Sequence, residues 1–174
     1  LALQNINQAQ TNQEVDQSQT NGNQEIRQIT PATIVKPEAR QALLSAVNNK
    51  KQIAFNDNDA TQDEKEAFIN DLNNLLNNLN KQITNDSTNQ EVTTTKDNGL
   101  DNIKQTVFKP TVKQTARDTI QQLFEKQQEL INNSQDATNE EKNNALIRLQ
   151  NKMEQLLNNI NNATTNAQVE QVQT

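Results

Sequence analysis

Apolar side chains recur along this chain at the spacing of one face of an α-helix, in three successive segments. In residues 37–56 the face consists of Ala39, Leu43, Ala46, Val47, Ile53 and Ala54. In residues 62–85 it consists of Phe68, Ile69, Leu72, Leu75, Leu76, Leu79 and Ile83. Residues 89–106 follow with Val92, Gly99 and Ile103. This spacing predicts three amphipathic helices, and no stretch alternates for long enough to predict a strand.

The predicted helix starts carry a signal of their own. Thr61 and Glu64 have the spacing of a capping box, in which a hydroxyl and a carboxylate each accept a hydrogen bond from a backbone N–H of the first turn. The same spacing recurs at Thr11 with Glu14, Thr88 with Glu91, Thr138 with Glu141 and, with glutamine, Thr165 with Gln168. Pro37 suits the first turn of a helix, where a missing N–H leaves no hydrogen bond unmade.

The whole pattern repeats after 77 residues without an insertion or a deletion. Residues identical at this offset include Gly22, Lys36, Arg40, Asp59, Thr61, Glu64, Leu72, Ile83 and Val92, which recur as Gly99, Lys113, Arg117, Asp136, Thr138, Glu141, Leu149, Ile160 and Val169. Such self-similarity is typical of tandem repeats. The copy of the first helix is therefore expected to have the apolar face Ala116, Ile120, Leu123, Phe124, Leu130 and Ile131. We divide the chain into the end of a preceding repeat (1–11), two repeats (12–88 and 89–165) and the start of a following one (166–174).

Three narrow apolar faces are buried most simply in a three-helix bundle. The short connection 56–60 predicts an antiparallel hairpin of the first two helices. Residues 84–87 allow two interpretations, a tight turn within a bundle or a near-collinear joint between bundles, and we favour the joint. Bundles would then span 12–85 and 89–162, each roughly 30–40 Å long at 1.5 Å per helical residue. The expected fold is all-α, with tandem three-helix bundles forming an elongated rod.

Several recurring residues outside the main stripe have both a structural and a functional interpretation. Gly22 and Gly99 lie in line with the apolar face of the third helix and predict close helix packing, or alternatively a flexible hinge. Arg40 and Arg117 predict a structural ion pair or an aliphatic stem over the core, rather than a ligand contact. The connections to the first helix carry apolar side chains that we expect to pack: Ile34, Val35, Val107, Phe108 and Val112.

Composition and charge narrow the range of partners. The net charge of the 174 residues is −6, the pI is about 4.7 and Lys and Arg form no cluster, so we expect no nucleic-acid partner. No apolar run approaches the roughly 18 residues that span a bilayer, and the first residues lack the charged segment of a signal peptide. Asn (30) and Gln (25) fill the expected solvent faces. We expect a monomer without membrane insertion.

One stretch has part of the spacing of a calcium-binding loop, with oxygen ligands at alternate positions: Asp57, Asp59, Thr61 and Asp63. The rest of that pattern is missing, because Gln62 replaces its glycine and Phe68 replaces its final glutamate. Acidic side chains near a helix N-terminus are favoured by the helix dipole without a metal. His and Cys are absent, and no base and nucleophile recur together. We predict no catalytic, cofactor-binding or metal-binding residue, no cofactor and no enzyme activity.

The recurring motifs also point to a family. They are Ala39-Arg40 in the first helix, Asp59-Ala60-Thr61-x-x-Glu64-Lys65 at the hairpin, Ile83 followed by Thr88 and Val92, and Gly99-x-x-x-Ile103. This pattern resembles an uncharacterised helical repeat, a domain of unknown function, that occurs in tandem in staphylococcal cell-wall-anchored surface proteins. The resemblance covers nearly the whole chain. It implies an extracellular location at the bacterial cell wall, attachment to peptidoglycan, and roles in cell aggregation, biofilm formation and adhesion.

Two classes of function fit these observations. The first is a structural stalk or spacer that projects an adhesive domain, with neighbouring repeats of the same chain as its partners. The second is a three-helix binding module that recognises a host matrix or plasma protein, or that self-associates between cells. Binding hot spots favour Trp, Tyr and Arg, yet Trp and Tyr are absent. The phenylalanines are expected at mostly buried positions: Phe55, Phe68, Phe108 and Phe124. We therefore favour the stalk.

Overall fold

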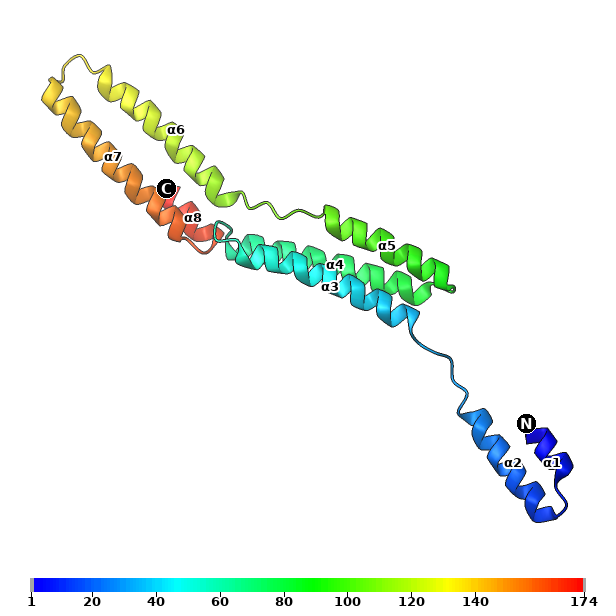
Figure 1. The fold of residues 1–174 in the computed structure, drawn as a ribbon. Helices are drawn as coiled ribbons and strands as arrows, with labels where there is room; N and C mark the ends of the chain where they lie inside the picture. Colours follow the sequence, from blue (N-terminus) through cyan, green and yellow to red (C-terminus); the bar gives the residue numbers. More distant parts are fainter. Residues whose placement is uncertain (1, 174) are drawn as a thin grey trace. The chain divides into compact units, whose positions relative to one another are not determined.

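The computed structural model describes residues 2–173, which form eight α-helices joined by short connections (Figure 1). They are α1 (Ala2–Gln8), α2 (Asn12–Arg27), α3 (Val35–Asn56), α4 (Gln62–Asn85), α5 (Asn89–Gln105), α6 (Val112–Asn132), α7 (Asn139–Asn162) and α8 (Asn166–Gln173). The all-α prediction is confirmed, and the second and third predicted helices begin where α4 and α5 begin. The chain divides after Pro37 into two units.

Polar side chains cap the helix starts as the sequence predicted. At α4, Thr61 Oγ1 accepts a hydrogen bond from Glu64 N at 3.3 Å, and Glu64 Oε2 accepts one from Thr61 N at 3.0 Å. Complete capping boxes also begin α2, α5 and α7. Thr165 and Gln168 make both bonds at the start of α8, at 3.3 Å each. Each cap contributes about 1 kcal/mol to the helix it begins.

Helices α3, α4 and α5 form the first bundle, and the apolar stripes of all three meet in its core. A Cβ atom placed on Gly99 of α5 would lie 2.8 Å from Leu43 Cδ2 of α3 and 3.0 Å from the methyl carbons of Leu79 of α4. Glycine therefore lets α5 approach both other helices, which confirms the packing interpretation. The buried apolar side chains of the three helices are Ala39, Leu43, Val47, Ala54, Leu72, Leu76, Leu79, Ile83, Val92 and Ile103.

The connection at residues 84–87 is a tight turn inside this bundle, and our expectation of a joint there is wrong. The turn leaves α5 packed against α4. Lys50 Nζ of α3 holds the other end of α5, donating to Lys104 O at 2.8 Å and to Thr106 O at 2.7 Å. Poor helix formers at 84–87 fit a turn and a joint equally well, and the close approach at Gly99 decides for the turn.

The second bundle consists of α6, α7 and the short α8. Its core is a cluster of five buried side chains, flanked by partly buried apolar residues: Ala116, Ile120, Ile160, Ala163 and Val169, with Val112, Met153, Leu156, Leu157 and Val172 around them. Leu123 and Leu130, which we expected to lie in the apolar face, are 59% and 57% exposed. The described part of α8 covers only the end of the hairpin near Ile160, so Leu123 has no third helix over it. Leu130 corresponds to Ile53 of the first bundle, which is also 57% exposed although α5 is present there.

The first unit contains the helical hairpin of α1 and α2, which corresponds to the α4–α5 turn at the 77-residue offset (Figure 1). A Cβ atom on Gly22 would lie 2.6 Å from Ala2 Cβ, so this glycine also permits close helix packing. Within residues 2–173, no helix combines the length and apolarity needed to cross a membrane.

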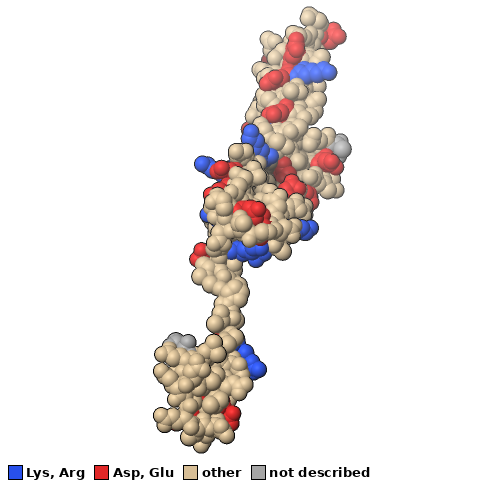
Figure 2. Space-filling view, turned by 90° about the vertical axis from the view of Figure 1, so that its right-hand side faces the viewer, with Lys and Arg blue, Asp and Glu red and all other residues tan. Residues whose placement is uncertain are grey.

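Neutral amides occupy much of the solvent face. In α4, Asn74, Asn77 and Asn78 are exposed, while Leu72, Leu76 and Leu79 on the opposite face are buried. Acidic and basic side chains are interspersed among uncharged ones on the face seen in Figure 2, and neither sign forms a continuous patch there. The face seen there therefore carries no large patch of one charge.

The expected burial of apolar side chains is also wrong at positions outside the two cores. Phe55 is 51% exposed, and the other three phenylalanines are only partly buried. Ile53 is 57% exposed because it lies at the edge of α3, beside a hollow of about 240 Å³ between α3 and α5. Val107 in the connection after α5 is 62% exposed, whereas Phe108 packs on Phe68 with ring centroids 5.0 Å apart. The connection is thus only partly packed.

Candidate functional site at the joint between two bundles

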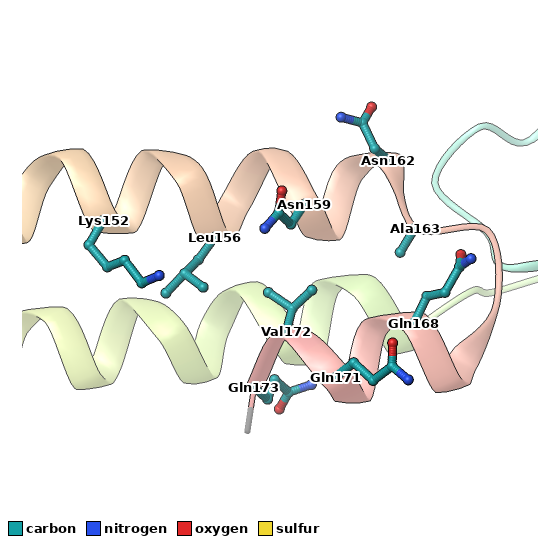
Figure 3. A pocket seen from close by; sticks show the side chains of 9 residues that line it. All are labelled: Lys152, Leu156, Asn159, Asn162, Ala163, Gln168, Gln171, Val172 and Gln173. Carbon is teal, nitrogen blue, oxygen red and sulfur yellow. The ribbon is translucent and has the colours of Figure 1, made fainter.

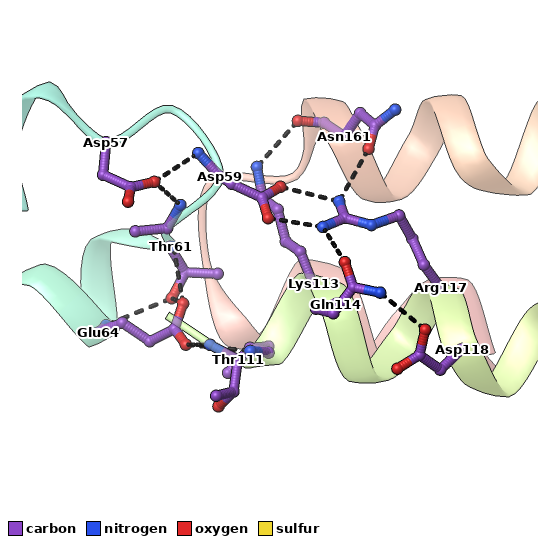
Figure 4. Close-up of polar contacts among 12 residues, drawn as sticks. Asp57, Asp59, Thr61, Glu64, Thr111, Lys113, Gln114, Arg117, Asp118 and Asn161 are labelled. Atoms are coloured by element: carbon purple, nitrogen blue, oxygen red, sulfur yellow. Dashed lines mark hydrogen bonds and ion pairs between the residues drawn. The ribbon is translucent and has the colours of Figure 1, made fainter. Parts of the chain in front are cut away.

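The first and second bundles meet through a network of polar contacts that we call the joint (Figure 4). On one side is the end of the α3–α4 hairpin, residues 57–64. On the other side are the first turn of α6, the end of α7 and the start of α8. Three helix N-termini, those of α4, α6 and α8, therefore lie close together. Each N-terminus has unpaired backbone N–H groups and a partial positive charge, so carboxylates are the natural partners.

Glu64 caps two helices at once. Its Oε2 atom completes the capping box of α4, and its Oε1 atom accepts hydrogen bonds from Thr111 N at 2.7 Å and Val112 N at 3.0 Å. The Thr111 side chain makes no capping hydrogen bond of its own to α6. A carboxylate from the first bundle thus takes the place of the missing N-cap of the second. By the usual value of a cap this contact contributes about 1 kcal/mol.

The start of α8 is held in a similar way by Thr61 and the two residues that follow it. Asp63 Oδ2 accepts a hydrogen bond from Asn166 N at 2.7 Å, and Thr61 Oγ1 donates to Asn166 Oδ1 at 2.6 Å. Gln62 N donates to Thr164 O at 2.7 Å. Thr61 is fully buried, with 0% of its surface exposed. The first turn of α4 therefore contacts the α7–α8 connection directly through backbone and side-chain atoms.

Asp59 and Arg117 form a two-pronged ion pair across the joint. Arg117 Nη1 lies 2.8 Å from Asp59 Oδ1, and Nη2 lies 2.6 Å from Oδ2. The side chains are 22% (Arg117) and 51% (Asp59) exposed, so solvent screens the pair and it contributes at most about 1 kcal/mol. The hydrogen bonds from Arg117 hold the pKa of Asp59 below its ordinary value. The predicted structural ion pair is confirmed for this arginine.

Lys113 is a buried cation at the same joint, with 3% of its surface exposed. Its Nζ atom donates to Asn161 O at 2.9 Å, in the last turn of α7. A cation at a helix C-terminus is stabilised by the helix dipole, and the nearby carboxylate of Asp59 adds a favourable interaction. This lysine therefore ties the start of α6 to the end of α7 beside the ion pair.

Glu64 remains ionised at the joint despite its partial burial. Burial raises its pKa, but hydrogen bonds from the backbone N–H groups of Thr61, Thr111 and Val112 lower it by more. The pKa of Glu64 therefore lies below its ordinary value. A charged carboxylate is the form that accepts three N–H donors, so protonation would weaken all of these contacts together.

The acidic residues with calcium-loop spacing have three different roles. Asp57 Oδ1 accepts hydrogen bonds from Asp59 N at 2.8 Å and Ala60 N at 3.0 Å, which closes the hairpin turn. Asp59 binds Arg117 and Asp63 binds the start of α8, so the three carboxylates do not converge. Across residues 2–173, no group of three or more acidic, His or Cys side chains has an arrangement that could hold a metal ion.

A cleft of about 710 Å³ lies beside α8 in the second bundle (Figure 3). Its lining is mostly amide and aliphatic side chains: Lys152, Leu156, Asn159, Asn162, Ala163, Gln168, Gln171, Val172 and Gln173. Asn and Gln donate and accept hydrogen bonds but do not exchange protons near neutral pH. The lining therefore offers no acid–base pair for chemistry.

A family model described as Domain of Unknown Function (DUF1542) matches the chain in three consecutive segments, residues 1–34, 35–111 and 112–174. The chain belongs to the DUF1542 family. No curated protein and no solved structure gave a significant match. The resemblance to a tandem helical repeat of unknown function is confirmed at the level of this family.

The DUF1542 segments follow the observed bundles. The middle segment, 35–111, is 77 residues long. It begins at the first residue of α3 and ends one residue before α6 begins. Our expected units, 12–88 and 89–165, have the same length and begin 23 residues earlier (35 − 12). A periodic sequence alone does not fix where its unit begins. The joint lies across the boundary between the second and third DUF1542 segments.

We did not predict that the recurring polar residues of a DUF1542 repeat meet those of the next repeat. The signal was present in the 77-residue register. Asp59 and Glu64, on one side of the joint, have the copies Asp136 and Glu141 further along the chain. Arg117, on the other side, is itself the copy of Arg40. A carboxylate and a guanidinium that recur in separate segments indicate an ion pair. The periodicity does not show whether the carboxylate binds the guanidinium of its own repeat or that of the next one.

Proposed function

We propose that this chain is part of a structural stalk, in which DUF1542 repeats act as spacers that project an adhesive domain of a bacterial cell-wall-anchored surface protein. In this role the repeats support cell aggregation, biofilm formation and adhesion. The observation that carries the proposal is the cap that Glu64 provides to α6, at 2.7 and 3.0 Å, because it couples the start of one bundle to the end of the preceding one.

A spacer needs length and a defined connection between its units. Helix α4 contains 24 residues, about 36 Å at 1.5 Å per residue, so repeats placed end to end would add length efficiently. The joint adds direct contacts at three helix N-termini and one ion pair to the covalent connection. In such arrays stability is approximately the sum of terms within repeats and terms between neighbours.

The cell-wall location and the adhesive role rest on the resemblance of the repeated motifs to staphylococcal surface proteins. The hydrophilic, amide-rich surface is compatible with such a location. Immunolabelling of intact cells of the source organism would test it, and detection only after the cells are lysed would contradict it.

Solution scattering tests the stalk directly. We expect the two bundles to give a maximum dimension of at least about 70 Å, twice the length of one bundle. A compact particle well below that value would contradict the elongated rod. The Asp59→Ala and Glu64→Ala double variant is the comparison. It removes the ion pair and the cap of α6, together with one bond of the α4 capping box, and leaves the apolar cores unchanged.

A binding module is the alternative, and binding measurements decide between the two. The chain is tested against fibrinogen, fibronectin, immunoglobulin and itself. We expect no specific complex, because Trp and Tyr, which favour binding hot spots, are absent from the chain. Specific binding at micromolar or lower concentration would replace the pure spacer with an adhesive repeat.

A further inference from the structure

We infer that the end of the α6–α7 hairpin, residues 134–141, is a docking surface for the first turn of a following DUF1542 repeat in the same polypeptide. This inference rests on the proposed stalk and deepens it by naming the contact that extends the array. The surface carries Asp136, Thr138 and Glu141, the copies of Asp59, Thr61 and Glu64 at the joint.

The two hairpin ends have the same key residues but different burial. At the first end Thr61 is 0% and Ala60 is 7% exposed, because the start of the second bundle covers them. At the second end the copy Thr138 is exposed and Ala137 is only partly buried. The local fold is the same, since both threonines begin a helix with a complete capping box. The difference in burial therefore reports the presence or absence of the covering repeat.

Hydrogen-bonding capacity differs in the same way. Glu141 Oε2 accepts from Thr138 N at 2.8 Å, as in the first copy. Within residues 2–173, the second oxygen of Glu141 and the carboxylate of Asp136 have no hydrogen-bond or ion-pair partner in the protein. The corresponding groups at the joint bind two backbone N–H groups and one guanidinium. The acceptors are thus arranged for the same set of donors.

The occupant is defined by the donors found at the joint. They are the backbone N–H groups of Thr111 and Val112 at the start of α6, the guanidinium of Arg117 five residues after Val112, and Asn166 at the start of α8. The preceding repeat has Val35, Arg40 and Asn89 at the positions of Val112, Arg117 and Asn166. Each repeat therefore carries one donor end and one acceptor end, and such a head-to-tail contact can continue without closing on itself.

Covalent connection explains why the partner belongs to the same chain. The joint consists of polar contacts that are partly exposed, and each contributes only about 1 kcal/mol or less. Two separate molecules would have to offset the loss of translational and rotational freedom with these few contacts. The short connection 106–111 holds the two ends together at high effective concentration.

The test extends the chain in register by fusing residues 98–174 after residue 174, because residue 174 corresponds to residue 97. Amide hydrogen exchange is measured at Thr111 and Val112 and at their copies in the fused segment. We expect the fused copies to be protected to within about threefold of the originals. Asp136→Arg should raise exchange at the fused copies at least fivefold and leave Thr111 and Val112 unchanged. Arg117→Asp in the fused segment should restore protection to the Asp136→Arg chain.

Unprotected fused amides, or Asp136→Arg without effect on them, would overturn the inference. Concentration-dependent association of the 174-residue chain that Asp136→Arg abolishes would overturn the requirement for one polypeptide. This test can fail independently of the proposed stalk. An extended particle with unprotected fused amides would contradict the docking surface and leave the spacer function supported. Protected fused amides in a compact particle would contradict only the spacer function.

Discussion

The two bundles of this chain are copies of one repeat, yet the same positions are buried to different degrees. Leu72 on α4 is fully buried, whereas its copy Leu149 on α7 is only partly buried. Leu76 is 9% exposed, and its copy Met153 is also less well covered. The third helix accounts for the difference, because α5 extends to Gln105 and α8 is described only to Gln173, which corresponds to Lys96.

The uncovered surface is a groove of about 270 Å³ between α6 and α7. It is lined by Ile120, Leu123, Phe124, Gln127, Leu149, Lys152, Met153 and Leu156. In the first bundle Gly99 and Ile103 of α5 fill the corresponding space, where Leu43 and Leu79 lie. The first two helices of a repeat thus form a hairpin whose apolar stripes are still open on one side. The second half of the third helix covers that side and completes the core.

The largest expected effect comes from removing the same leucine in each bundle. Leu72→Ala should destabilise the first bundle by about 2–5 kcal/mol, because it leaves a cavity in a closed core. Leu149→Ala should destabilise the second bundle by about 1–2 kcal/mol, since the partly exposed side chain has less to lose. Hydrogen exchange resolved for each bundle measures both effects. Equal losses would contradict the difference in core closure.

Overpacking at the third helix should have the next largest effect. Gly99→Leu places side-chain atoms where Leu43 and Leu79 already lie, and we expect a loss of about 1–3 kcal/mol from the first bundle. Asn102→Leu on the exposed face of α5 is the control, and it should change stability by less than about 0.5 kcal/mol. Thermal unfolding followed by circular dichroism compares the two variants. If both behaved alike, Gly99 would not be a packing residue.

Local signals in the sequence predicted the helices well. The capping boxes at Thr61 and Thr88 placed the starts of α4 and α5, and the 77-residue register predicted the same helices in the second copy. These features depend on residues three or four positions apart, which the chain itself brings together. The register also explains why one glycine per repeat recurs, since the same close approach is needed each time.

Contacts between distant segments were less accessible to sequence reasoning. The turn at 84–87 was mistaken for a joint because no local residue distinguishes a reversal from a straight connection. Leu123 was expected inside because its spacing fits the stripe, although burial also depends on a helix that covers it. The capping of α6 by Glu64 links residues 47 positions apart, and periodicity alone does not reveal that partner.

Loss of the N-cap hydroxyl should have a moderate effect that differs between the two hairpin ends. Thr138→Ala removes a cap and should cost about 1 kcal/mol. Thr61→Ala removes the same cap and also the bond to Asn166 Oδ1, so its cost should reach about 2 kcal/mol. Amide exchange in the first turns of α4 and α7 measures each effect. Identical costs would show that the bond across the joint contributes nothing.

Acid should produce the smallest effect, and it should weaken the joint before the helical cores. Asp59 and Glu64 have lowered pKa values in the folded protein. They therefore stabilise it fully above their ordinary values, near pH 4, and lose that contribution as the pH falls through the lower folded values. We expect the amide resonances of Thr111 and Val112 to shift and their exchange, corrected for intrinsic rates, to increase below about pH 4.

The second hairpin end separates this effect from a general loss of caps. The pKa of Glu141 is lowered by its hydrogen bonds from Thr138, so acid weakens the capping box of α7 as well. Protonation of Glu141 releases only that box, whereas protonation of Glu64 releases a box and the cap of α6. Glu64→Gln should therefore remove the pH dependence at Val112, and Glu141→Gln should leave it unchanged. A response at Val112 that survives Glu64→Gln would assign the acid sensitivity to Asp59 and its ion pair instead.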